Sequence, residues 1–162
     1  MVITIRPAQA SDAVRWEQIH ANGWEYAYRG IFDDEYLDAA KEKFRKNIDK
    51  TTAYLSGNNG INLVAINETG LVVGTMFGRL SVSESGEKAF ELQGLYLDPE
   101  YIGCGAGKKL VHAFADWVKQ NGVLIFGRAI CAIHELILFM NCCSSGKILK
   151  HFCSSCDIMI SE

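Results

Sequence analysis

The sequence predicts a single three-layer α/β (α+β) domain, in which a mixed, mostly antiparallel sheet is flanked by helices. Its 162 residues are 49% hydrophobic and 22% charged, which suits one globular domain with a substantial core. The middle of the chain alternates short apolar runs with turn residues, a pattern typical of an antiparallel meander. An apolar pattern with helical spacing follows it. We therefore expect residues 1–162 to form one domain.

Charge and the start of the chain limit the classes of partner. A formal net charge of −3 provides no basic surface for neutralising phosphates, so nucleic acid is not expected as a partner. The opening residues MVITIRPAQASDAV lack the basic and apolar regions of a signal peptide, and no stretch approaches about 18 uninterrupted apolar residues. We expect a cytoplasmic protein with no membrane partner, and a homodimer is left open.

The N-terminal region should form a strand followed by a helix. Residues 3–8 alternate apolar and polar side chains around Pro7, as a strand with one buried face does. Ser11 or Asp12 is suited to cap the helix that follows.

A second helix should follow a break at Gly30. Asp33 or Asp34 is placed to cap it, because acidic residues are favoured at the start of a helix. Helical spacing predicts an apolar face made of Tyr36, Leu37, Ala40 and Phe44.

Three apolar stretches, residues 51–56, 62–81 and 88–99, then predict the antiparallel meander. Within the second stretch, the polar residues Glu68 to Gly70 interrupt the apolar pattern, which indicates a hairpin turn. Residues 105–121 should form an amphipathic helix, ending where Gly122 would adopt a left-handed conformation.

A glycine-rich bend joins the last of these stretches to the helix. Gly103, Gly105 and Gly107 lack the Cβ atoms that would hold an anion away from the backbone, and Lys108 and Lys109 add positive charge. The first amides of a helix are unpaired and attract anions, so the bend can hold a phosphate. The alternative is a tight turn without a ligand.

The segment ELQGLYLDPEYIGCGAGKKLVHAFADWVKQNG, residues 91–122, resembles the acetyl-CoA-binding segment of the GCN5-related N-acetyltransferases (GNATs). The family loop Gln/Arg-x-x-Gly-x-Gly/Ala aligns with Ile102, Gly105 and Gly107, so the glycines match and the first polar residue does not. The resemblance extends over residues 2–122 in element order. It implies a GNAT-like fold and transfer of an acetyl group from acetyl-CoA to a primary amine of a small molecule or peptide.

The same resemblance assigns roles to individual residues. The backbone of Leu95, Tyr96 and Leu97 would run beside the pantetheine arm, with the amides of Leu95 and Leu97 polarising the thioester carbonyl. The pyrophosphate would lie on the loop formed by Gly103, Cys104, Gly105, Ala106, Gly107 and Lys108.

Glu91 is the candidate catalytic residue. It precedes Leu95 where some family members carry the carboxylate that deprotonates the amine. The alternative is an ordinary solvated strand residue.

In this family the acceptor site is built largely by the first two helices and their connection. Trp24, Tyr26 and Tyr28 would line such a slot, and the acidic run from Asp33 to Glu35 would attract a cationic amine. The competing interpretation is that the aromatics form core and the acids complement the helix dipole.

The segment 123–162 diverges from the family. The expected Asn-x-x-Ala-x-x-Phe-Tyr helix, whose tyrosine protonates the leaving thiolate, is absent, and the last tyrosine of the chain is Tyr101. Reading the codons of His134 to Cys143 two nucleotides later permits Arg-Ala-x-x-Phe-Tyr-Glu-Leu-Leu, so we hypothesise a frameshift and impaired catalysis. Residues 123–127 should still add a strand, and residues 133–140 should form a buried helix.

Two further hypotheses concern other protein classes. A chain that keeps the loop but lacks the tyrosine would bind acetyl-CoA without catalysis. The second is a zinc or redox module that uses the cluster Cys142, Cys143, His151, Cys153 and Cys156. The acetyltransferase interpretation, which we favour, involves no metal.

Overall fold

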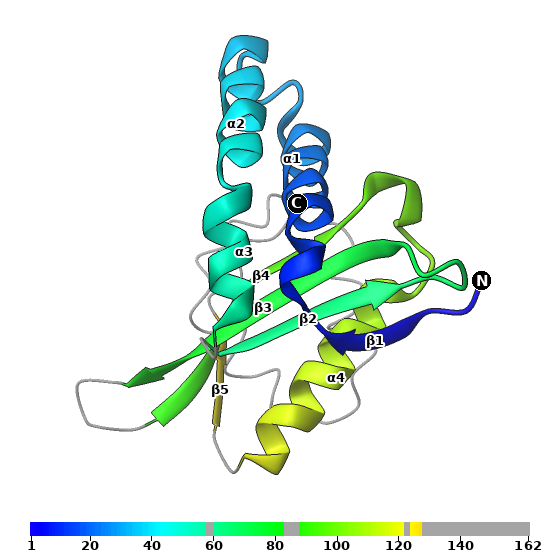
Figure 1. The fold of residues 1–162 in the computed structure, drawn as a ribbon, viewed down its shortest axis with the longest axis vertical. Helices are drawn as coiled ribbons and strands as arrows, with labels where there is room; N and C mark the ends of the chain where they lie inside the picture. Colours follow the sequence, from blue (N-terminus) through cyan, green and yellow to red (C-terminus); the bar gives the residue numbers. More distant parts are fainter. Residues whose placement is uncertain (58–59, 83–87, 122–123, 128–162) are drawn as a thin grey trace, which may run out of the picture.

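A five-stranded sheet forms the centre of the protein in the computed structural model, which describes residues 1–57, 60–82, 88–121 and 124–127 (Figure 1). The strands lie in chain order. The first four are antiparallel, and the last runs parallel to its neighbour. Their bounds are β1 Thr4–Pro7, β2 Ile61–Ile66, β3 Val72–Val82, β4 Lys88–Leu97 and β5 Leu124–Gly127.

Helices cover both faces of this sheet. Figure 1 shows α1, α2 and α3 on one face and α4 on the other, which gives the three layers that the sequence predicted. The bounds are α1 Ala13–Tyr28, α2 Asp34–Lys46, α3 Ile48–Ser56 and α4 Ala106–Gln120, with 3₁₀ turns η1 Ala10–Asp12 and η2 Pro99–Tyr101.

Two apolar cores follow from the alternation of side chains across the sheet. On β2, Leu63 and Ala65 face α4, whereas Val64 between them packs on the α1 side. The α4 side of the core is completed by Leu110 and Phe114, one helical turn apart and both buried.

Most of the predicted elements are confirmed. The strand at residues 3–8 appears as β1, the meander as β2 to β4, and the strand predicted after the last helix as β5, Leu124–Gly127. In the β2–β3 hairpin, the Asn67 side chain accepts hydrogen bonds from the amides of Thr69 and Leu71. Asp33 is the N-cap residue of α2. On the predicted apolar face of this helix, Leu37 is buried but Tyr36 is exposed.

The expectation of an extended segment at residues 51–56 is wrong, because these residues belong to α3. Their threonines and tyrosine favour a strand by propensity alone. Ile48 and Leu55 instead pack on the α1 side of the core, and the Thr51 hydroxyl donates to Glu17 of α1. Tertiary contacts therefore override the local preference.

Several expectations fall on parts of the chain outside the described residues. These are the left-handed Gly122, the helix at 133–140 and the cysteine cluster of the zinc hypothesis. Among the helices of the described part, none is both long enough and apolar enough to cross a membrane.

Candidate functional site

Strand β4 carries a bulge next to the segment that the sequence assigned to acetyl-CoA. Phe77 of β3 pairs with Gly94, but the next residue, Gly78, pairs with Leu92, so Gln93 is an extra residue on β4. A bulge bends its strand and changes where the following backbone groups point. The bulge at Gln93 thus separates the start of β4 from residues 95–97, which pair regularly with β3.

The pairing of β4 with β5 covers the start of β4. It runs from Ala89 to Leu92, whose partner is Gly127. Glu91 lies within this paired part, opposite Arg79 of β3 on one side and Phe126 of β5 on the other. The structure thus places the backbone of the candidate base one residue before the last described β4–β5 pair.

The glycine bend between β4 and α4 has the conformation that a phosphate loop requires. Gly103 and Gly105 have φ angles of 83° and 85°, in the left-handed region that favours glycine. A Cβ atom added at either position would meet no atom of the described residues within 4 Å. Gly105 is the N-cap residue of α4 and, having no side chain, cannot itself accept a hydrogen bond from the first amides of the helix. The first amides of a helix have no partner within the helix, so those of α4 are available to an anion.

Gly107 has a different role from the other two glycines. An added Cβ there would lie 3.4 Å from Cδ1 of Leu97 and 3.9 Å from Cδ2 of Leu95. Gly107 thus faces β4, and the neighbouring Ala106 is fully buried in the core. These small residues bring the first turn of α4 close to the strand proposed to hold the pantetheine arm.

Among the side chains of the bend and the first turn of α4, some are exposed to solvent and others are packed against the protein. Lys108 is exposed at the start of α4, where a cation can meet an anionic ligand. Lys109 instead donates a 2.7 Å hydrogen bond to the carbonyl oxygen of Ile3, which ties α4 to the start of the chain. The expectation that Lys109 adds positive charge at the bend is therefore wrong, because its ammonium group is directed toward Ile3. Cys104 is partly buried against the α4 side of the core.

Side chains of the β4 segment point to both faces of the sheet. Leu95 and Leu97 pack in the core beneath α4, whereas Tyr96 lies on the other face, where its ring is 4.1 Å from that of His20. All three side chains are engaged in packing. Any contact of this segment with acetyl-CoA would use mainly its backbone, as the sequence predicted.

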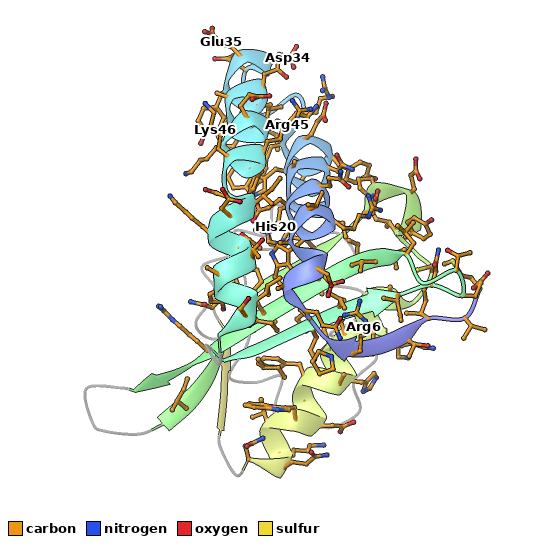
Figure 2. The ribbon with its side chains drawn as sticks, viewed as in Figure 1. Arg6, His20, Asp34, Glu35, Arg45 and Lys46 are labelled. Atoms are coloured by element: carbon orange, nitrogen blue, oxygen red, sulfur yellow. The ribbon has the colours of Figure 1, made fainter. Side chains whose placement is uncertain are left out.

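His20 is a buried polar residue that the sequence did not single out. It projects from α1 toward the sheet, where its Nε2 lies 3.1 Å from Oγ1 of Thr75 (Figure 2). The rings of Trp16, Phe44 and Tyr96 surround it. Burial lowers the pKa of His20 from 6.5 to about 3, so the imidazole is neutral at physiological pH.

A second contact that the sequence did not reveal joins α1 to the turn after β4. The Arg15 guanidinium forms an ion pair with the Asp98 carboxylate, which is buried, and its Nε donates to the carbonyl oxygen of Val72 at 2.9 Å. Arg15 and Asp98 are 83 residues apart, so no local pattern could have paired them.

The proposed acceptor aromatics pack against one another between α1 and α2. The rings of Trp24 and Tyr28 lie 4.8 Å apart, and Trp24 also meets Phe44 of α2 at 6.2 Å. Tyr26 points away and is 63% exposed. The structure therefore brings Trp24 and Tyr28 together but leaves Tyr26 apart.

The acidic residues proposed to attract a cationic amine lie at the start of α2. Figure 2 shows Asp34 and Glu35 at the tip of α2, distant from the sheet. Asp34 also accepts a hydrogen bond from Arg29 at 3.3 Å. This position suits the alternative interpretation, in which acids near the start of α2 complement its dipole. In the described residues, no group of three or more His, Cys, Asp or Glu side chains is arranged to hold a metal ion.

Known proteins with similar sequences are N-acetyltransferases. The spermidine N(1)-acetyltransferase of Thermoplasma acidophilum is 28% identical over 127 residues, which cover 76% of this chain and 75% of that protein. YuaI of Bacillus subtilis, described as an uncharacterized N-acetyltransferase, is 28% identical over 122 residues, covering 75% of this chain and 67% of YuaI.

Solved structures support the same fold. The PaiA N-acetyltransferase of Thermoplasma acidophilum, in complex with coenzyme A, superposes with a TM-score of 0.60 and 25% identity over 76% of each chain. An aminoglycoside acetyltransferase from an uncultured soil metagenomic sample, 17% identical, has a TM-score of 0.60, with 85% of this chain and 87% of that chain covered. The model of the acetyltransferase (GNAT) family matches residues 17–131, which lie across the bulged strand, the glycine bend and α4. This chain therefore belongs to the GCN5-related N-acetyltransferase family, whose acyl donor is acetyl-CoA.

Proposed function

We propose that this chain transfers the acetyl group of acetyl-CoA to a primary amine of a small molecule or peptide. The observation that carries the proposal is the junction of β4 and α4, where two left-handed glycines lead into the N-terminus of α4. The relative named as a spermidine acetyltransferase supports an amine as acceptor.

In the proposed complex, the backbone of residues 95–97 holds the pantetheine arm and the amides of residues 103–108 hold the pyrophosphate. The bulge at Gln93 redirects β4 just before the first of these segments. Gly107 has no Cβ, which lets the second segment lie close to Leu97 in the first. The donor would thus lie along β4 with its phosphates at the positive end of α4.

The transfer itself needs two proton movements. The amine nitrogen attacks the thioester carbonyl carbon, the C–S bond breaks, and CoA departs as a thiolate that must gain a proton. Glu91 is proposed as the base that takes the proton from the amine, directly or through a water. No tyrosine follows Tyr101, so the proton for the thiolate must come from another group or from solvent.

This lack of a tyrosine leads to slow transfer rather than none. General acid assistance is typically worth about 10²–10⁴-fold in rate. We therefore expect kcat to be lower by about this factor than in an enzyme that has the tyrosine. Binding of acetyl-CoA should be unaffected because its proposed contacts precede the divergent tail. A chain that binds acetyl-CoA but releases no CoA would be a binding protein, the alternative that the sequence raised.

The experiment is a two-part assay on the purified full chain. Calorimetry measures binding of CoA, and mass spectrometry measures acetylation of a panel of amines that includes spermidine and a peptide with a free N-terminus. Free CoA is followed by chromatography, because the six cysteines of the chain would react with a thiol reagent. Absence of both CoA binding and acetylation at millimolar ligand would refute the proposal.

Glu91 is tested by comparing Glu91→Gln with Glu68→Gln, a variant in the exposed β2–β3 turn. The first should lower kcat by about 10²-fold or more while the CoA dissociation constant stays within about twofold. The second should leave both unchanged. Equal kcat values in the two variants would remove Glu91 from the mechanism.

A further inference from the structure

Arg15 and Asp98 connect the first helix to the root of the glycine bend. The Arg15 side chain is 23% exposed and the Asp98 side chain 6%, so the ion pair is mostly withdrawn from water. Nη2 of Arg15 donates to Oδ2 of Asp98, while Nε donates to the carbonyl oxygen of Val72 at 2.9 Å. One guanidinium thus binds both the strand β3 and the residue that follows β4.

Asp98 is in turn the residue from which the bend extends. Its amide donates to the carbonyl oxygen of Val73 at 3.0 Å, and its Oδ1 accepts from the amide of Glu100 at 3.4 Å. Its own carbonyl oxygen accepts from Tyr101 at 2.8 Å, and the Tyr101 carbonyl accepts from Cys104 at 3.4 Å. A series of local hydrogen bonds therefore leads from Asp98 into the bend.

The charge of Asp98 creates a second requirement. Asp98 caps the turn η2 that leads into the bend, and a buried carboxylate in that turn repels an approaching pyrophosphate unless a cation neutralises it. Arg15 supplies that cation from α1. Its planar fork also fixes the direction of the carboxylate, which a flexible ammonium group does less well.

We propose that Arg15 is a positioning residue for acetyl-CoA: by fixing and neutralising Asp98, it presets the 103–105 bend for the pyrophosphate. The inference rests on the proposed function, since it assumes that this bend holds the donor's phosphates. Arg15 acts through Asp98 and has no contact with the reacting atoms in this scheme.

A matched control exists in the same molecule. Arg6 of β1 forms a two-bond ion pair with Asp12, at 2.7 and 2.8 Å, before α1 (Figure 2). The exposed fractions of its two side chains, 29% and 8%, are close to those of the Arg15–Asp98 pair. Arg6→Lys and Arg6→Met should therefore cause a similar structural loss without affecting the bend.

The test compares the Arg15 and Arg6 variants with three probes, using calorimetry on the full chain. CoA and dephospho-CoA contain the pyrophosphate, whereas pantetheine lacks it. Arg15→Met should weaken binding of the first two by about tenfold, and Arg15→Lys by about threefold, with pantetheine changed by less than about twofold. The Arg6 variants should leave all three affinities unchanged, although their melting temperatures fall.

A further variant separates the two effects of Arg15. Asp98→Asn removes the negative charge but keeps an oxygen for the amide of Glu100, so it should lose less CoA affinity than Arg15→Met. Equal losses of CoA and pantetheine affinity in Arg15→Lys, or the same losses in Arg6→Lys, would overturn the positioning role while leaving the proposed function intact. If the unmodified chain binds no CoA, both proposals fail together.

Discussion

The buried His20 makes the stability of this protein depend on pH in a calculable way. The imidazole is 7% exposed and its pKa falls from 6.5 to about 3 on folding. Between pH 6.5 and about 3, His20 is therefore protonated in the unfolded chain but neutral in the folded chain. The stability that His20 contributes is fully present above pH 6.5 and is lost as the pH falls toward 3.

The two pKa values fix the magnitude of this loss. The stabilising contribution of His20 should fall by up to about 1.4 kcal/mol per pH unit below 6.5, which amounts to about 2 kcal/mol between pH 7.5 and pH 5.0. Asp12, whose pKa is lowered from 3.8, loses its contribution only at lower pH. The chosen window therefore isolates the histidine from this carboxylate.

The assay is urea-induced unfolding of the full chain and of His20→Gln at these two pH values. Glutamine keeps an amide for the hydroxyl of Thr75 but does not titrate, so the variant should start less stable at pH 7.5 and lose about 2 kcal/mol less on acidification. His112→Gln, which removes an exposed imidazole from α4, is the control. If His20→Gln and the unmodified chain lose the same stability, the reasoning about His20 is refuted.

Three other predictions concern a buried carboxylate, a crowded glycine and the tail. Burial raises the pKa of Glu17 above 4.5, and its Oε2 has no hydrogen-bond partner among the residues that the structure describes. The stabilising contribution of the protonated carboxyl group is therefore present below pH 4.5 and lost as the pH rises through the folded pKa. Glu17→Gln should stabilise the protein at pH 7.5, and a lower urea midpoint would argue against this. At Gly94 an added Cβ would lie 2.6 Å from the ring of Phe77, so Gly94→Ala should cost about 1–3 kcal/mol in the same unfolding assay, and no loss would mean that the rings move aside freely. A frame-restored tail should raise kcat by about 10²–10⁴-fold in steady-state kinetics with little change in CoA affinity, whereas an unchanged kcat would count against the frameshift hypothesis.

The elements that carry the family signature were readable from the sequence because their signals are local. The apolar spacing around Leu110 and Phe114 predicts α4, and the polar turn at Glu68 to Gly70 predicts the β2–β3 hairpin. The spacing of its glycines also predicted the bend before α4. In the structure, Gly103 and Gly105 adopt the left-handed conformation that glycine favours.

The features that the sequence did not reveal depend on contacts between distant residues. Residues 51–56 read as extended by propensity, and only the packing of α3 against α1 makes them helical. His20 and Thr75 are 55 residues apart, so their hydrogen bond has no sequence signal. The orientation of Lys109 toward Ile3, and not toward the bend, likewise follows from how α4 lies on the sheet.

Binding of CoA to the bend between β4 and α4 is tested most directly by comparing Gly105→Ala with Gly70→Ala. Both glycines have left-handed φ angles, 85° and 83°, and in the described part of the chain no atom would lie within 4 Å of a Cβ added at either position. Both substitutions should therefore cost a similar amount of stability, about 1 kcal/mol.

Only at Gly105 would the added methyl group occupy the space proposed for the pyrophosphate. Calorimetric titration with CoA should show at least about tenfold weaker binding for Gly105→Ala and less than about twofold change for Gly70→Ala. Unchanged CoA affinity in Gly105→Ala would show that the bend is only a turn.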